Sequence, residues 1–417
     1  MTAVATTTPT APQHDTMLQF PIQGNELTVG GLTMTQISAV LNKTVFYAYD
    51  RNVINQQVAR FRAAMPARIH LHYAIKANPY PPVIQHMRGL VDGFDVASQK
   101  EMLLAVQAGM PVRDISFAGP GKGDAELLSA IMLGVTLHVE SLGELARIDT
   151  LGRAAGKTPQ VALRVNPAFE LKSSGMKMAG GAKPFGIDEE QVFALLADFS
   201  GYQVNLRGFH IFCGSQNLKA EALIEAHQLT FALAAKLTAA SPYRPDVINL
   251  GGGLGIPYFA GEKRLNLQEI GANLQQLTEQ YASDFAGIEL VIELGRFLVA
   301  EAGLYVCQVL DKKVSRGTTY LVCNGGLHHH LSNSGNFGQV IRKNYPVAIA
   351  NRMQQTEREV VTVVGPLCTP LDIVADKMEL ASADVGDWVA VFQSGAYGAT
   401  ASPQDFLGHP AVAEILL

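Results

Sequence analysis

The sequence predicts an α/β protein in which a (β/α)8 barrel is followed by an antiparallel β domain. Between about Ile69 and Glu293, eight strand-like runs alternate with amphipathic helical runs, as is typical of parallel sheets built from β-α units. After about Phe297, strand-like runs follow one another between turns rich in Gly, Pro, Asn and Asp, which predicts antiparallel strands. An open doubly wound sheet is the structural alternative, and only the count of eight strands favours a closed barrel.

The expected strands are short apolar runs bounded by turn residues. In the barrel they span residues 69–76, 93–98, 114–119, 136–141, 161–166, 206–212, 247–252 and 289–294. The amphipathic runs between them predict helices, among them residues 99–109, 124–134, 142–156 and 221–240. In the second domain we expect strands within residues 304–314, 318–326, 358–368 and 387–398.

These patterns divide the chain into four parts. Residues 1–20 are rich in Thr, Pro and Ala and lack the basic start and apolar core of a signal peptide, so we expect a disordered tail. Residues 21–48 are expected to add one or more strands to the β domain. The barrel is assigned residues 49–297, and the β domain residues 298–417.

Composition excludes several classes of protein. Of the 417 residues, 48% are hydrophobic and 17% are charged, so the chain can bury a large core. The formal net charge of −5 provides no basic field for nucleic acid, and no apolar run is long enough to span a membrane. The four cysteines are scattered without a CxxC pair, which favours a reducing, cytoplasmic setting.

Three consecutive histidines, residues 328–330, raise the question of a metal site. Consecutive side chains of a strand point to alternate faces, so the three do not readily converge on one ion. The sequence also has no HExxH motif and no spaced set of Cys and His. We therefore expect no metal.

The first barrel strand ends in HYAIKANPY, residues 72–80, which places a lysine at the end of an apolar run. Alternate residues of a strand share a face, so His72, Ala74 and Lys76 should point inward, with Lys76 at the carboxyl mouth of the barrel. A desolvated lysine there can form a Schiff base with a carbonyl compound, of which pyridoxal phosphate is one. The alternative is a lysine that simply reaches solvent at a strand end.

Pyridoxal phosphate would need a phosphate cradle, a partner for its pyridine nitrogen and a proton donor. NLGGGLG, residues 249–255, and CGSQN, residues 213–217, each follow a strand and offer N–H groups or the Ser215 hydroxyl to a phosphate; flexible turns are the alternative. Glu293 can hold a protonated pyridine nitrogen, whereas an ordinary ion pair with Arg296 is the alternative.

Two motifs of the second domain offer further groups. VVGPLCTPLD places Cys368 in a Gly/Pro loop, where a thiol can donate a proton; an inert, small apolar cysteine is the alternative. GAYG offers Tyr397 as a phosphate or substrate contact, with a hydrophobic filler as the alternative.

Together these segments resemble the fold-type III pyridoxal-phosphate-dependent decarboxylases, the group of diaminopimelate, ornithine and arginine decarboxylases. The resemblance runs from about Phe46 to Pro410. Its motifs occur in the family's order: YAIKAN, GFDVAS, HVESLGEL, RVNP, FGI, GSQ, GGGLG, ELGRFLVAEAG, GPLC and GAYG. It implies an alanine-racemase-like barrel with a β domain, assembled as a head-to-tail homodimer that shares its active sites.

The resemblance also implies roles for individual residues. Lys76 is similar to the lysine that forms the Schiff base, and Glu293 to the partner of the pyridine nitrogen. Cys368 is similar to the cysteine that reaches the neighbouring subunit's cofactor and protonates the product. The expected phosphate contacts are Ser215, Gly251, Gly252, Gly253, Gly295, Arg296 and Tyr397. Further expected cofactor contacts are Asp95, His210 and Phe212, and the expected substrate contacts are Arg164, His328, Thr369 and Asp372.

Three departures from the family pattern concern the cofactor face and the far end of the substrate. The residue that stacks on the ring is usually a histidine, whereas FHIFCGSQ places Phe212 there, two residues after His210. An acidic residue usually follows the cysteine, whereas Thr369 follows Cys368. NGGLHHHLS has no arginine of the kind that binds the distal carboxylate in diaminopimelate enzymes.

Both charge partners for the far end of the substrate are therefore missing from their family positions. A site built for a neutral end rejects a charged one, so we infer a substrate whose far end is uncharged or esterified. The β-domain motifs most closely resemble a subgroup associated with exosortase clusters and secondary metabolism. Some of its members decarboxylate an aminoacyl group tethered to a carrier protein.

The function expected is α-decarboxylation of an amino acid, or of an aminoacyl group on a carrier protein, through Lys76 and Cys368. A decarboxylase of a free diamino acid (diaminopimelate, ornithine or lysine) is the first alternative. An amino-acid racemase is a second; it needs a second base and usually an arginine at the ring nitrogen, so Glu293 argues against it. A non-catalytic protein of the same fold is a third, but it would have no need of Lys76 or Cys368.

Overall fold

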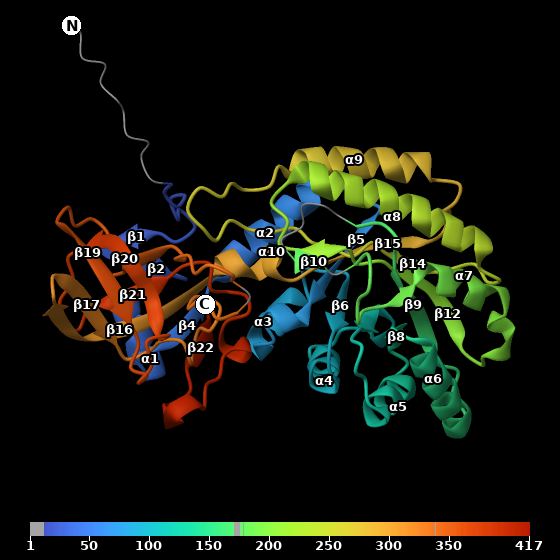
Figure 1. Cartoon of the computed structure of the whole chain (residues 1–417), viewed down its shortest axis with the longest axis horizontal. Helices are drawn as coiled ribbons and strands as arrows, with labels where there is room; N and C mark the ends of the chain where they lie inside the picture. The colour runs from blue at the N-terminus through green and yellow to red at the C-terminus, as the bar shows by residue number, and fades with distance from the viewer. Residues whose placement is uncertain (1–11, 171–175, 178, 338) are drawn as a thin grey trace, which may run out of the picture.

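The computed structural model describes residues 12–170, 176–177, 179–337 and 339–417. Two bodies lie side by side in Figure 1: a barrel, coloured blue to yellow, and a β domain, coloured mainly orange and red with blue segments beside it. The described chain begins beside the β domain, builds the barrel and then returns to the β domain.

A closed ring of eight parallel strands forms the barrel. Around the ring the order is β5, β6, β7, β8, β9, β12, β14 and β15, and β15 pairs with β5 to close it. The predicted barrel is thus confirmed over the open sheet, and each strand overlaps a predicted run. The strands are β5 (Ile69–Ala74), β6 (Gly93–Val96), β7 (Ile115–Phe117), β8 (Thr136–Val139), β9 (Gln160–Asn166), β12 (Asn205–His210), β14 (Val247–Asn249) and β15 (Glu289–Leu294).

Helices alternate with the strands and cover the outside of the barrel (Figure 1). They are α2 (Arg51–Ala64), α3 (Pro81–Met87), α4 (Gln99–Gln107), α5 (Asp124–Leu133), α6 (Leu142–Ala155), α7 (Glu189–Ala197), α8 (Ala220–Ala240), α9 (Leu267–Gln280) and α10 (Arg296–Val299). Local sequence sets their starts: the Ser98 hydroxyl accepts the N–H of Glu101 at the start of α4, and Ser141 accepts that of Glu144 at α6. Within the described ranges, no helix combines the length and apolarity needed to cross a membrane.

Three short strands extend the loops at the carboxyl ends of the barrel strands. β10 (Met176–Lys177) pairs with β13 (Gly214–Ser215), which follows β12. β11 (Ile187–Asp188) pairs with the end of β9. These pairings hold the loops in place around the mouth, where barrel enzymes carry their chemistry.

The β domain is built on one eight-stranded sheet whose pairings are mostly antiparallel. Two pairings, β17 with β19 and β22 with β4, are parallel, so the sheet is mixed where the sequence predicted an antiparallel one. A long connection separates the strands of each parallel pair, as a parallel crossover requires. The strands are β4 (Phe46–Tyr49), β16 (Gly303–Ser315), β17 (Thr318–Cys323), β18 (Val347–Ile349), β19 (Arg358–Val364), β20 (Ile373–Ala381), β21 (Trp388–Val391) and β22 (Ala413–Leu416).

The N-terminal segment packs on the β domain. β1 (Ile22–Gln23), β2 (Glu26–Val29) and β3 (Leu32–Thr33) form a separate three-stranded sheet, followed by α1 (Met34–Leu41). The N–H of Leu27 donates to the carbonyl of Ala350 at 2.7 Å. Of the expected tail, residues 1–11 lie outside the described residues; residues 12–20 contain no helix or strand, and Phe20 is buried against the domain.

Hydrogen bonds join the two domains beside the barrel mouth. The Asn78 side chain donates to the carbonyl of Gly395 at 3.0 Å. The N–H of Tyr397 donates to the carbonyl of Ala77 at 2.8 Å, with Tyr397 held at a φ of 53°, which is uncommon for a residue other than glycine. The β domain therefore fixes the turn that carries Lys76.

Gly271 lies in α9 where this helix packs on α2, and a methyl group added there would overlap the carbonyl oxygen of Ala64. We predict that Gly271→Ala lowers the free energy of unfolding by about 1 to 3 kcal/mol, because the two helices must move apart. Chemical denaturation followed by circular dichroism measures this loss.

Gly143→Ala in α6 is the matched control, because the added methyl would lie 4.0 Å from its nearest neighbour, the Ser141 hydroxyl. This variant should be as stable as the wild type or slightly more so, since alanine favours a helix over glycine. Equal stability of the two variants would show that α9 does not press on α2 at Gly271.

Candidate active site

Two adjoining cavities, of about 120 Å³ and about 200 Å³, lie at the carboxyl mouth of the barrel. Ala74, Lys76, Phe212 and Glu293 line both of them. The first cavity is also lined by Ser215, Gly253, Leu254, Leu294, Gly295, Arg296 and Tyr397. The second is also lined by Asp95, Val96, Ala97, Ala118, Gly119, Pro120, Arg164, Phe185 and His210. Most of the predicted cofactor residues therefore meet at one place.

Lys76 stands between the two cavities. It follows β5 in a single 3-10 turn, Ile75–Ala77, and not in the strand itself. The alternation predicted from the sequence still applies, because His72 lies buried in the barrel interior and Ala74, like Lys76, lines both cavities. Its Nζ lies 5.9 Å from the centroid of the Phe212 ring. The side chain is exposed, so one chain does not by itself provide the desolvation expected for this lysine.

The Glu293 carboxylate is buried at the end of β15. Its Oε2 accepts a hydrogen bond from Nδ2 of Asn249 at 3.1 Å and lies 3.5 Å from Nε2 of His210. Burial alone would raise the pKa of this carboxyl, but the His210 imidazole and the Lys76 ammonium outweigh it and hold the pKa of Glu293 well below its usual range. Glu293 is therefore an anion that can hold a proton on a ring nitrogen.

Arg296 is a half-buried cation at the start of α10, and its Nε is fully buried. Its Nη1 donates to the Tyr258 hydroxyl at 3.0 Å, and its guanidinium carbon lies 4.6 Å from the centroid of the Tyr397 ring. Nε has no hydrogen-bond partner, and no ion pair joins Arg296 to a carboxylate within the described ranges. A half-buried guanidinium with a free, buried Nε–H suits an anion such as phosphate, and the alternative of a Glu293–Arg296 pair is not what the structure shows.

The glycines of NLGGGLG divide into two kinds. Gly253 lines the first cavity, as Gly295 does from α10's start. Gly251 and Gly252 line neither cavity: Gly251 has a φ of 71°, and a methyl group on Gly252 would overlap the carbonyl oxygen of Glu293. The structure thus assigns Gly252 to the close passage of the chain beside β15 and Gly251 to its close passage beside residues 211–212 after β12, and leaves Gly253 to face the cavity.

Arg164 reaches the wall of the second cavity with its charge already paired. Its Nη1 donates to Oε1 of Glu140 at 2.7 Å, and its guanidinium carbon lies 5.2 Å from the centroid of the Phe185 ring. Glu140 also accepts the N–H groups of Gly119 and Gly186, at 2.6 and 3.1 Å. Burial opposes its ionisation, yet Arg164 and these bonds hold the pKa of Glu140 below its usual value. The guanidinium is therefore fixed in position.

Asp95 and His210 form the inner part of the same cavity. Asp95 accepts a hydrogen bond from the Ser116 hydroxyl, and its Oδ1 lies 3.6 Å from Nδ1 of His72. The His210 ring lies 6.3 Å from that of Phe212, centroid to centroid. Phe212 is thus the residue of this pair that faces both cavities, as its position in the sequence predicted.

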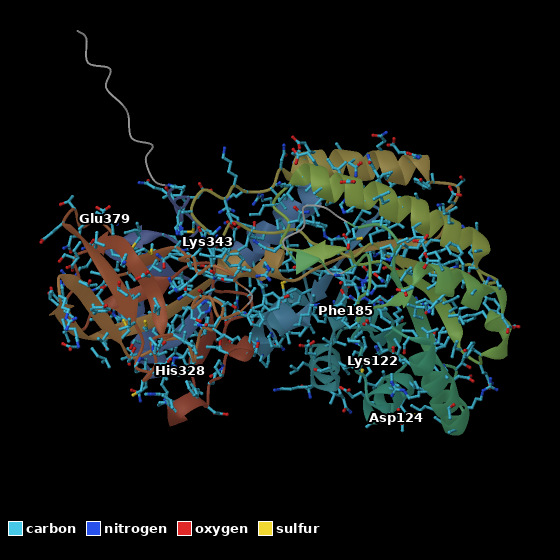
Figure 2. The ribbon with its side chains drawn as sticks, viewed as in Figure 1. Lys122, Asp124, Phe185, His328, Lys343 and Glu379 are labelled. Carbon is cyan, nitrogen blue, oxygen red and sulfur yellow. The ribbon has the colours of Figure 1, made fainter. Side chains whose placement is uncertain are left out.

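The predicted proton donor and the predicted substrate contacts of the β domain lie apart from Lys76. None of Cys368, Thr369, Asp372 and His328 lines either cavity. Cys368 is exposed, whereas His328 is buried against His329, with ring centroids 3.7 Å apart. Burial lowers the pKa of His328 to about 3. Figure 2 shows His328 within the β domain and Phe185 at the barrel. A single chain therefore does not bring Cys368 to Lys76.

Asp372, predicted to contact the substrate, is instead a buried structural residue. It is 2% exposed, and both carboxylate oxygens are engaged: Oδ1 accepts the N–H of Leu327 at 2.6 Å and Oδ2 that of Leu367 at 2.8 Å. A methyl group on Gly326 or Gly365 would overlap the carboxylate. Both carboxylate oxygens of Asp372 are engaged within the chain, and the residue ties the turn after β17 to the loop after β19.

Three residues of the site were not predicted: Asn249, Tyr258 and Phe185. Asn249 begins NLGGGLG, and a polar residue ending an apolar strand was the signal that could have revealed it. Tyr258 and Phe185 lie in loops, whose course periodicity does not predict. In the part of the chain that the structure describes, no group of three or more His, Cys, Asp or Glu side chains could hold a metal ion.

Comparison with known proteins gives these residues a context. The family profile described as "Pyridoxal-dependent decarboxylase, pyridoxal binding domain" matches residues 51–300. The L-glutamyl-[BtrI acyl-carrier protein] decarboxylase of Niallia circulans is 35% identical over 393 residues, which cover 92% of each chain. The 2-[(L-alanin-3-ylcarbamoyl)methyl]-2-hydroxybutanedioate decarboxylase of Staphylococcus aureus is 32% identical over 388 residues, which cover 90% of this chain and 94% of that one.

Solved structures share the whole architecture. Diaminopimelate decarboxylase from Helicobacter pylori complexed with L-lysine superposes with a TM-score of 0.80 at 26% identity, covering 91% of this chain and 94% of that one. Diaminopimelate decarboxylase from M. jannaschii gives a TM-score of 0.85 at 24% identity, covering 95% and 92% of the two chains. The likeness therefore extends over both the barrel and the β domain.

We predict that Asp372→Ala lowers the free energy of unfolding by about 2 to 4 kcal/mol, because two buried N–H groups lose their acceptor at roughly 1 to 3 kcal/mol each. Asp376→Ala is the control, since Asp376 is exposed and its carboxylate accepts the Thr362 hydroxyl at 3.2 Å. It should change stability by less than about 0.5 kcal/mol. Denaturation midpoints measure both, and a loss no larger for Asp372 than for Asp376 would contradict the structural role.

Proposed function

The chain belongs to the pyridoxal-dependent decarboxylase family, and from this membership we propose that it removes the α-carboxyl group of an aminoacyl substrate whose far end is uncharged or joined to a carrier protein. The coarser activity, decarboxylation of an amino acid with pyridoxal phosphate, follows from the family match and from two relatives at 35% and 32% identity. The finer proposal rests on one observation. The β-domain segments around Cys368 offer no charged side chain to a substrate.

The residues at the mouth fit the family's cofactor. When bound, pyridoxal phosphate supplies an aldehyde and a ring that withdraws electrons from the bond to be broken. The unpartnered Nε of Arg296, the Ser215 hydroxyl and the open faces of Gly253 and Gly295 suit its phosphate. The anionic Glu293 suits its ring nitrogen. The residues that suit the cofactor's phosphate and its ring nitrogen thus line the same cavity as Lys76.

Each of these side chains has a distinct task in the proposed reaction. The Lys76 amine would hold the cofactor's aldehyde within reach of the substrate's amine. The Glu293 carboxylate would keep a proton on the ring nitrogen, which would favour loss of CO2. Phe212 offers an apolar face between the two cavities, at the position where the family usually has a histidine.

We propose that Cys368 acts in the site of a second copy of the chain, in a homodimer. Its thiol would donate a proton to the α-carbon of the substrate after CO2 has left. Two facts support this assignment: Cys368 is exposed, and it lines neither cavity next to Lys76 of its own chain. Cys368 of one chain therefore does not serve the Lys76 of that chain. The family resemblance favours Cys368 of the neighbouring subunit as the proton donor.

The segments on either side of Asp372 are uncharged. Residues 366–371, PLCTPL, contain no ionisable side chain except the Cys368 thiol, and residues 325–334 contain only histidines as titratable groups. Burial lowers the pKa of His328 and of His330 to about 3, so both are neutral at pH 7. A charged far end placed against these segments would lack a counter-ion. A neutral or esterified end would meet no such penalty.

The names of two relatives support the same direction. The enzyme of Niallia circulans is named for a glutamyl group on an acyl-carrier protein, and that of Staphylococcus aureus for an alanine unit joined through a carbamoyl group. In both, the amino acid is part of a larger molecule. Diaminopimelate decarboxylase of Aquifex aeolicus is also a relative, at 28% identity, so a free diamino acid is the competing substrate.

We predict that Lys76→Ala loses the cofactor's absorbance at the edge of the visible range and at least about 10³-fold of the decarboxylation rate, because no other amine replaces the nucleophile. Absorbance spectra and CO2 release measure the two effects. Lys100→Ala, at an exposed position of α4, is the control and should keep both. A Lys76→Ala variant that decarboxylates at the wild-type rate would refute the assignment.

We predict that CO2 release from a glutamyl thioester exceeds release from free diaminopimelate, ornithine or lysine by about 10²-fold or more, because the free diamino acids carry an unpaired charge into the site. Mass spectrometry of the products measures both classes in parallel. Rapid turnover of a free diamino acid would overturn the proposed substrate class and leave the decarboxylase assignment intact.

Restoring an acid next to Cys368 tests the reason for that preference. Thr369→Asp should raise kcat/KM for a free diamino acid by roughly tenfold, since a carboxylate returns to the position that is acidic in the family. Thr356→Asp, at an exposed loop position, is the control for added charge and should change nothing. Equal kinetics for the two variants would show that Thr369 does not meet the far end of the substrate.

A further inference from the structure

The interior of the barrel contains a column of buried polar side chains. Barrel interiors are ordinarily filled by layers of branched apolar residues. Here inward positions of β5, β6, β8, β12 and β15 carry titratable groups, all buried: His72, Asp95, His138, His210 and Glu293. The phosphate cradle and Lys76 do not use His72 or His138, so these two histidines need another explanation.

A small cavity reaches this column from the amino end of the barrel. It has a volume of about 30 Å³ and is lined by buried His72, His138 and Asn249 and by the more exposed Arg113 and Glu289. Glu289 is the first residue of β15, whereas Glu293 lies at the other end of the same strand. A water molecule needs roughly 10 to 15 Å³ of such space and two to four polar partners. The cavity is therefore polar and large enough for ordered water.

Several nitrogen atoms of the column lack a hydrogen-bond partner. Within the described part of the chain, both ring nitrogens of His72, both of His210 and Nδ1 of His138 are buried without one. Buried polar groups in native proteins are nearly always paired, and ordered water supplies the partner where protein does not. Water in the amino-end cavity would satisfy the histidines that line it.

A single layer of side chains separates this cavity from the Glu293 carboxylate. Asn249 lines the cavity and donates to Oε2 of Glu293 at 3.1 Å. His138 also lines it, and its ring centroid lies 4.4 Å from that of His210. His210 in turn places Nε2 at 3.5 Å from the same carboxylate oxygen. One side chain (Asn249) or two (His138 and His210) therefore lie between the Glu293 carboxylate and the amino-end cavity, which is on the face opposite the substrate.

We propose that ordered water in the amino-end cavity connects the His210–Glu293 pair to solvent through His138, which acts as a positioning residue. Its importance for the reaction rests on the proposed function, in which Glu293 holds the ring nitrogen. When the mouth is covered by cofactor and substrate, this route lets the pair exchange protons without passing the reacting atoms.

The charged and titratable groups around the pair allow such a route. They are Lys76 after β5, His72 on β5, Asp95 on β6, Lys122 before α5, His138 on β8, Arg164 on β9 and Glu289 at the start of β15, with Arg113, Asp114 and Arg207 on the wall of the amino-end cavity. Burial, followed by the neighbouring His210, lowers the pKa of His138 well below its usual value, so its ring is neutral at pH 7. A neutral imidazole can accept a proton at one nitrogen and release one from the other, so no net charge stays in the barrel.

A high-resolution crystal structure of the cofactor-free protein tests the water directly. We expect at least one ordered water within hydrogen-bonding distance of a ring nitrogen of His72 or His138. A dry cavity would overturn the proposal. This readout involves no decarboxylation, so its failure and the failure of the proposed function are separate results.

The second test is the rate at which the bound cofactor's absorbance relaxes after a pH jump, because the spectrum reports protonation next to Glu293. His138→Phe keeps the ring shape without its nitrogens and should slow this relaxation by about tenfold or more. His227→Phe is the matched control: both histidines are 3% exposed with an unpartnered Nδ1, but His227 lies in α8, outside the barrel interior.

Slowing in the His138 variant alone supports the route, and unchanged relaxation in it refutes the route. His138→Asn, which is polar but does not titrate, replaces the phenylalanine variant if that one does not fold, and the same slowing is expected. The relaxation rate separates this role from a purely structural one, since a structural defect would not change the relaxation rate of correctly folded protein.

Discussion

The pairing of the first barrel strand with the last is the contact on which the active site depends. The register of β5 and β15 sets Glu293 opposite His72, so the two residues share the inward face. Lys76 follows on the same face, next to Gly295, where a methyl group would lie 2.8 Å from Cβ of Ala77. A slip of one residue would turn Glu293 toward the helices. Closure of the ring therefore brings together the amine and the carboxylate that the proposed chemistry would use.

The β domain supports the turn of Lys76 and places Tyr397 at this site, but it holds Cys368 outside the site. The bonds from Asn78 to Gly395 and from Tyr397 to Ala77 fix the turn of Lys76, and the Tyr397 ring covers the Arg296 guanidinium. In the same domain, Asp372 holds the loop of Cys368 against the turn after β17, outside both cavities. The site of one chain thus has cofactor partners without the proposed proton donor, which is what a shared site in a homodimer would require.

The alternation of residues along strands explains how much of this could be predicted. It located the eight strands, the mouth, Lys76 and Glu293, because each depends on local periodicity. It could not separate Gly253 from Gly251 and Gly252, since that distinction depends on which neighbouring segment passes close to each glycine and which glycine lines the cavity. The burial of Asp372, the Tyr258 contact to Arg296 and the parallel pairing of β17 with β19 join residues far apart in the chain. No local pattern encodes such contacts.

The two cavities differ in whether the arginine that lines them is already paired with a carboxylate. In the second cavity the Arg164 guanidinium is held by Glu140 and faces Phe185, so its charge is largely compensated. In the first, Arg296 has tyrosines for neighbours and no carboxylate partner within the described residues. A dianionic phosphate therefore gains most from the first cavity. The second cavity offers an anion no unpaired guanidinium, because Glu140 already holds Arg164.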